Sequence, residues 1–155
     1  MLNQSQQPAS KFNQYDVTGC INVTKVSDVC HAVLDILQKT YPETTREAVL
    51  IRQVYQDFER LFTGQYPGYH SCDTLYHDIQ HTLDMSLVMA RLLSAFEQAY
   101  PDAQQGLDRF VFGMTVALFH DSGYIRQTQL DNAINGAAYT LSHVTRSGRF
   151  LKHYL

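Results

Sequence analysis

The sequence predicts an all-α protein, a bundle of several helices. Apolar residues recur every three or four positions in several segments, which is the spacing that gives a helix one apolar face. No run of alternating apolar and polar residues is long enough for a pair of strands. With 155 residues, of which 45% are hydrophobic, the chain is expected to form a single domain with its own core.

The N-terminal third of the chain is expected to contain a polar arm and two helices. Residues 1–22 are predicted to form the arm, because this segment is polar, rich in glutamine and has no apolar run typical of a secretory signal. The helical domain is predicted over residues 23–155. Its first helix covers residues 26–39 and ends before Pro42, since proline cannot continue a helix. The second covers residues 44–62, with Gly64 as its stop.

The remaining helices follow a loop that is predicted at residues 65–73. Asp73 or Thr74 is expected to cap a long helix over residues 75–100, with Leu75 on its buried side. The next helix, over residues 104–119, is apolar on almost every side in its second half, which is typical of a central helix. Further helices are predicted over residues 130–146 and from residue 149 onward.

Composition limits the expected partners and location. The net charge of −3 provides no basic surface for duplex nucleic acid, although a metal or an arginine could still hold a small anion. The three cysteines form no C-x-x-C pair, so we expect reduced thiols in a cytoplasmic protein. No apolar segment is long enough for a membrane span, and no membrane partner is expected. A homodimer is left open.

Two short segments contain the residue types that bind divalent metals. In the segment YHDIQH, His77 and His81 are four residues apart, and on one helix they would share a face. In the segment LFHDSG, His120 precedes Asp121 at the end of the apolar helix, where a carboxylate is costly to desolvate unless a cation is near. Each segment alone has an ordinary explanation, such as a chance histidine pair or a histidine bonded to a backbone carbonyl. Together they predict a metal site between central helices.

The pattern Y-H-x-x-x-H-x-x-D at Tyr76–Asp84, followed by an apolar helix that ends in H-D, resembles the HD-domain superfamily of metal-dependent phosphohydrolases. The resemblance covers about residues 76–123 and implies an HD-domain-like bundle. It implies that His81, His120 and Asp121 hold one or two divalent ions (Mg, Mn, Fe, Ni, Co or Zn), with Asp121 bridging two where two bind. His77 would be the general acid that protonates the leaving oxygen, so His77 and Asp121 are the expected catalytic residues.

The implied activity is hydrolysis of a phosphoester by metal-activated water, and the implied ligand is a nucleotide or similar small phosphorylated molecule. Arg126 is a candidate for binding phosphate, because a guanidinium matches its geometry. Tyr124 is a candidate for stacking on a base. Asp84 could orient a ligand imidazole. His143 could serve a second metal, although a half-buried or surface histidine is the favoured interpretation.

The chain also departs from the family. The family supplies a last aspartate ligand from a helix well beyond the His-Asp pair, but only 34 residues follow Asp121 here (155 minus 121). Asp131 comes early for that role, so the C-terminus is expected to be truncated or the site incomplete. Tyr124 stands near the position where phosphodiesterases have a second histidine. The alternative is therefore a catalytically incomplete nucleotide-binding or sensory module, and a di-iron oxygenase is a further alternative that nothing in the sequence requires.

Overall fold

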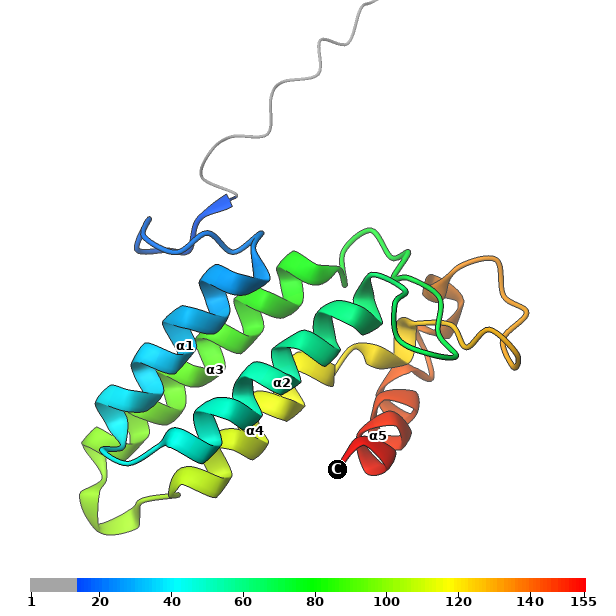
Figure 1. The fold of residues 1–155 in the computed structure, drawn as a ribbon. Coiled ribbons are helices and arrows are strands. Elements are labelled where there is room, and N and C mark those ends of the chain that lie inside the picture. The colour runs from blue at the N-terminus through cyan, green and yellow to red at the C-terminus, as the bar shows by residue number, and fades with distance from the viewer. Residues whose placement is uncertain (1–13) are drawn as a thin grey trace, which may run out of the picture.

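The computed structural model describes residues 14–155, so residues 1–13 of the predicted arm lie outside the described residues. The described part is all-helical, with five α-helices, short 3-10 turns and no β-strand within residues 14–155 (Figure 1). The predicted all-α fold class is confirmed. None of the helices in this part is long and apolar enough to cross a membrane.

Four helices form the body of the bundle. They are α1 (Val26–Thr40), α2 (Thr45–Phe62), α3 (Ile79–Ala99) and α4 (Leu107–Phe119). Helix α1 packs on α2 and α3, and α4 also packs on α2 and α3, so each helix has two neighbours among the other three (Figure 1). The apolar faces meet in one core, whose fully buried members include Val33, Leu37, Phe58, Leu83 and Phe110. Burial of these side chains from all four helices is the main stabilising contribution to the bundle.

Helix α3 begins at Ile79, four residues later than predicted. Asp78 is its N-cap, because the Asp78 carboxylate accepts a hydrogen bond of 2.9 Å from the His81 backbone N–H. Neither Asp73 nor Thr74 caps the helix, and Leu75, predicted to be buried, is fully exposed. The Thr74 hydroxyl instead donates a hydrogen bond of 2.8 Å to the carbonyl of His77. His77 therefore lies in a tight turn before the helix rather than within it.

The prediction of a helix over residues 130–146 is wrong. Residues 130–142 are irregular apart from a 3-10 turn at Gly136–Tyr139, and α5 runs over His143–Tyr154. Tertiary contacts hold the irregular segment, since Asp131 pairs with Arg146 at 2.6 Å and the Gly136 N–H donates to Asp73 at 2.7 Å. The two helices predicted at the C-terminal end are thus replaced by a loop and one helix, which lies at the end of α4 (Figure 1).

Residues 14–22, which belong to the predicted arm, pack against the bundle. Tyr15 and Asn22 form an isolated β-bridge, and the Asp16 carboxylate pairs with the Arg91 guanidinium of α3 at 2.6 Å. Desolvation raises the pKa of Asp16, but the hydrogen bonds from Arg91 and from the Ile21 N–H outweigh it and hold that pKa well below its ordinary value. This part of the arm is therefore folded onto α3.

Candidate metal centre

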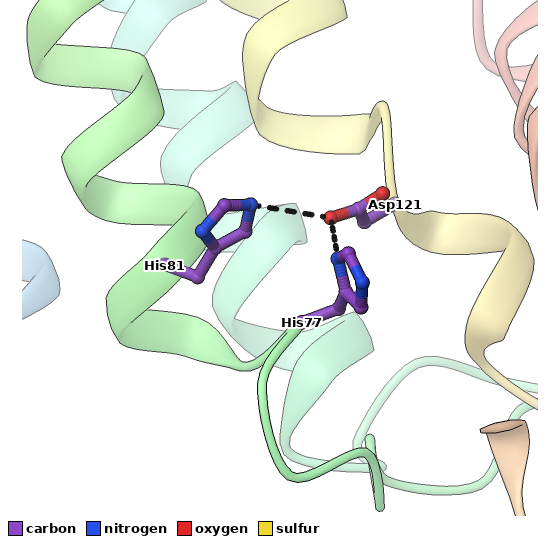
Figure 2. Close-up of side chains that lie close together, drawn as sticks. All are labelled: His77, His81 and Asp121. Carbon is purple, nitrogen blue, oxygen red and sulfur yellow. Dashed lines mark hydrogen bonds and ion pairs between the residues drawn. The ribbon is translucent and has the colours of Figure 1, made fainter.

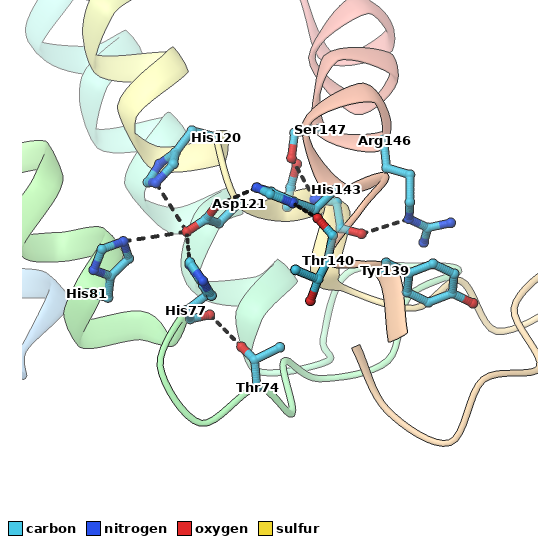
Figure 3. Close-up of polar contacts among 12 residues, drawn as sticks. Thr74, His77, His81, His120, Asp121, Tyr139, Thr140, His143, Arg146 and Ser147 are labelled. Atoms are coloured by element: carbon cyan, nitrogen blue, oxygen red, sulfur yellow. Dashed lines mark hydrogen bonds and ion pairs between the residues drawn. The ribbon is translucent and has the colours of Figure 1, made fainter. Parts of the chain in front are cut away.

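The candidate centre is built where α4 ends. The last turns of α4 are buried, as Met114, Leu118 and Phe119 show. His120 and Asp121 follow directly, at the end of this central helix. Two other segments meet them there, the start of α3 with the turn before it and the start of α5 (Figure 2, Figure 3). The Asp121 side chain is only 3% exposed.

Four imidazoles surround the Asp121 carboxylate (Figure 3). Its Oδ2 lies 2.8 Å from Nδ1 of His77, 3.1 Å from Nε2 of His120 and 3.5 Å from Nε2 of His81. Its Oδ1 lies 3.9 Å from Nε2 of His143. The structure thus brings together all the predicted ligands and the predicted general acid, and it adds His143.

The group His77, His81 and Asp121 could hold a metal ion, because one ligand atom from each residue lies within 4.8 Å of the other two (Figure 2). Ligand atoms bonded to one ion at about 2.1 Å, at tetrahedral or octahedral angles, lie about 3.0–3.4 Å from one another. The distances of 2.8, 3.1 and 3.5 Å around Oδ2 are close to that range. The distances from Oδ2 to the three nitrogens are thus compatible with a small divalent ion bound beside this oxygen.

The second nitrogens of two imidazoles strengthen this fit. Nδ1 of His120 lies 2.8 Å from the carbonyl oxygen of Ala117, and Nδ1 of His143 lies 2.7 Å from that of Thr140. A carbonyl only accepts hydrogen bonds, so both Nδ1 atoms carry a proton. In the neutral form each Nε2 then has a lone pair turned toward the carboxylate, and a proton or a cation at this point relieves that repulsion. This tautomer is the usual one for metal-bound histidine.

Asp121 and His81 have protonation states that suit metal ligands, whereas a proton on His120 would compete with a metal. Burial raises the pKa of Asp121, but its hydrogen bonds and charge contacts with His120 and His77 prevail and lower it from 3.8 to about 2. The hydrogen bond to Asp121 raises the pKa of His120, against the effect of desolvation. Desolvation lowers the pKa of His81, against the attraction of Asp121. At neutral pH the carboxylate is therefore ionised and His81 is neutral, as metal ligands must be.

Tyr124, predicted to stack on a base, stacks on two histidines of the centre in this structure. Its ring is buried, with 4% exposure, and stacks on His77 at 4.5 Å and on His143 at 4.4 Å between centroids. The two imidazole centroids lie 6.1 Å apart, so both histidines contact the one tyrosine ring and lie near each other. The ring of Tyr124 therefore supports two histidines of the centre by stacking on them.

Arg126, predicted to bind phosphate, is engaged elsewhere. Its guanidinium donates to Asp73 at 2.9 Å and to the carbonyl of Ala133 at 3.1 Å, so it joins the loop before α3 to the loop before α5. Asp84 contacts His81 only through its charge, and no hydrogen bond joins the two in the described residues. Asp131 binds Arg146 and does not belong to the centre.

The position of His143 beside Asp121 depends on the glycine at position 123. A Cβ at Gly123 would collide with the carbonyl oxygen of His143 and with the Ser147 backbone nitrogen, so only glycine lets α5 approach the turn after Asp121 so closely. The Gly123 N–H also donates to the Ser147 hydroxyl at 2.8 Å. His143, for which a half-buried or surface position was favoured over a role at a second metal, is half-buried and lies beside Asp121.

Comparisons with family models, curated proteins and solved structures found no match for this chain. The resemblance to the HD-domain superfamily therefore rests on the two motifs alone.

Proposed function

We propose that this protein is a metal-dependent phosphohydrolase that acts on a phosphoester of a nucleotide or a similar small molecule. One observation carries the proposal: a buried, ionised carboxylate has imidazoles from three separate segments around it, and two of them present Nε2 in the tautomer typical of metal ligands. An uncompensated carboxylate at such a site is costly, and a divalent cation offsets that cost.

We assign His81, His120 and Asp121 as the metal-holding residues. His77 lies in the same close group, but it projects from the turn before α3 rather than from a helix. Since its Nδ1 faces Asp121, its Nε2 is the atom available to give a proton to a departing alkoxide. When bound, a divalent metal supplies Lewis-acid polarisation of a phosphoryl oxygen and a nucleophilic water at neutral pH.

A binding or sensory module is the second candidate. It is favoured by Asp131, the only aspartate after Asp121, because both of its oxygens bind Arg146, at 2.6 and 3.1 Å. Within the described residues no further carboxylate joins the group of His77, His81 and Asp121. A centre with one carboxylate would hold a ligand through the metal without the full ligand set of the hydrolases it resembles.

Metal content and turnover together separate these candidates. Purified wild-type protein, His120→Ala and the control His31→Ala, an exposed histidine on α1, would be assayed for metals by mass spectrometry and for hydrolysis of nucleoside monophosphates and cyclic nucleotides. We expect near-stoichiometric metal and turnover in wild type and control, and loss of both in His120→Ala. Metal without turnover would favour the sensory module, and turnover that survives in His120→Ala would refute the proposed centre.

A further inference from the structure

A cavity of about 520 Å³ lies between the loop that follows α2, the turn after Asp121 and the outer part of α5. None of the four histidines around Asp121 lines it, so it is separate from the candidate metal centre. Its volume falls within the range of about 300–1,000 Å³ that is usual for small-molecule sites.

One wall of this cavity is aromatic. Tyr66 and Tyr69 come from the loop after α2, and Phe150 comes from α5. The three ring centroids lie 5.7 to 6.0 Å from one another, and each pair is edge-to-face. Edge-to-face packing turns ring faces and edges in different directions, which suits a flat aromatic ligand that can stack on one ring and meet the edge of another.

Of the two arginines that line the cavity, one has its charge neutralised by a carboxylate and the other does not. Arg146 is neutralised, because its guanidinium binds Asp131 through two nitrogens. Arg149, one turn further along α5, is exposed, and its guanidinium has no hydrogen bond or ion pair within residues 14–155. A free guanidinium beside an aromatic wall is suited to a phosphate or carboxylate, which it can bind with two parallel hydrogen bonds.

We propose that this cavity binds a planar aromatic anion of nucleotide size. The flat ring lies on the wall of Tyr66, Tyr69 and Phe150, and the anionic group lies at Arg149. The site requires no metal. It adjoins Gly123, whose carbonyl accepts a hydrogen bond of 2.7 Å from Arg146, so a bound ligand contacts the turn that follows Asp121.

The test uses AMP as the probe, with adenosine and inorganic phosphate as partial probes, and ¹⁵N-labelled full chain kept free of metal by chelation. We expect AMP to shift the amide resonances of Tyr66, Gly68 and Tyr69 and of residues 146–154, and to bind more tightly than either partial probe. Arg149→Ala should weaken AMP about tenfold or more and leave adenosine unchanged, because it removes only the charge-assisted hydrogen bonds.

Arg109→Ala is the matched control, since Arg109 is an exposed arginine on α4 that does not line the cavity. It should bind AMP as wild type does, and circular dichroism would verify the fold of both variants. The proposal is overturned if AMP causes no shift at millimolar concentration, if the shifts are confined to residues 77–81 and 120–121, or if phosphate alone binds as tightly as AMP. Equal AMP affinity in wild type and Arg149→Ala would also overturn it.

Discussion

The imidazole of His143 stacks on the ring of Tyr124, with 4.4 Å between centroids and 16° between planes. His77 also stacks on Tyr124, at 4.5 Å between centroids, and the two histidines contact different oxygens of the Asp121 carboxylate. The buried ring of Tyr124 thus helps to fix the positions of two imidazoles that come from different segments. Tyr124 thus supports two of the histidines around Asp121 from one side chain.

Removing the ring should disturb both the fold and the centre. Tyr124→Ala is expected to lower the free energy of unfolding by about 3 kcal/mol, because truncation of a buried aromatic side chain leaves a cavity. It should also weaken metal binding, since His77 and His143 lose their support. Tyr124→Phe keeps the ring and is the control, which should retain metal affinity. Urea unfolding and metal titration measure the two effects, and unchanged metal affinity in folded Tyr124→Ala would contradict the role of the ring.

Acid should destabilise the metal-free protein partly through Asp121. Its pKa falls from 3.8 to about 2 on folding, so its contribution is complete above about pH 4 and is lost as the pH falls toward 2. A shift of this size corresponds to about 2 kcal/mol. The free energy of unfolding, measured by urea at several pH values, should therefore fall less steeply for Asp121→Asn than for wild type. Parallel curves for the two proteins would contradict the expectation.

Metal affinity should rise with pH near neutrality. His120 must be neutral to offer Nε2 to a metal, and its hydrogen bond to Asp121 raises its pKa above 6.5. Metal therefore competes with a proton below the raised pKa, and affinity should increase about tenfold per pH unit until that pKa is passed. His81 adds no such dependence at neutral pH, because its pKa is lowered. Competition with a chromophoric chelator across pH 6–8 measures the slope, and a flat profile would argue against His120 as a ligand.

Arg146 should matter for stability rather than for ligand binding at the centre. Its guanidinium holds Asp131, the carbonyl of Gly123 and the carbonyl of Ile125. Arg146→Ala would leave the largely buried Asp131 carboxylate unpaired, and we expect a loss of about 3 kcal/mol. Arg149→Ala, an exposed arginine on the same helix, should cost far less. Thermal unfolding of both variants tests the difference, and equal melting temperatures would contradict it.

The sequence predicted helices well where apolar periodicity and a stop residue agreed. The prediction of 26–39 became Val26–Thr40, and 44–62 became Thr45–Phe62. The start of α3 was missed because Asp73 and Asp78 are equally good caps by composition, and the choice depends on the turn at Thr74 to His77. The segment 130–142 was missed because contacts with residues distant in the chain hold it, and these override local helix propensity.

The candidate centre, too, could be predicted only where its residues lie in local motifs. His77, His81, His120 and Asp121 were found because they lie in two compact motifs at the ends of apolar helices. The predicted reason for the first pair was wrong, since His77 precedes α3 and does not share a helical face with His81. Tyr124 was identified, but as a contact for substrate. Its burial against two imidazoles follows from the packing of α5 onto Gly123. No local sequence pattern predicts this packing, because it joins segments that are distant in the chain.

The assignment of His77 as proton donor gives the sharpest prediction about chemistry. If it protonates the leaving oxygen, His77→Ala should keep its metal and lose about 10²-fold or more in kcat on a substrate with an alkoxide leaving group. The loss should be much smaller on a p-nitrophenyl phosphoester, whose leaving group needs no proton. Mass spectrometry of metal content and kinetics on both substrates test this. Loss of metal from His77→Ala would instead make His77 a ligand, in line with its 2.8 Å contact to Asp121, and equal losses on both substrates would remove its role as an acid.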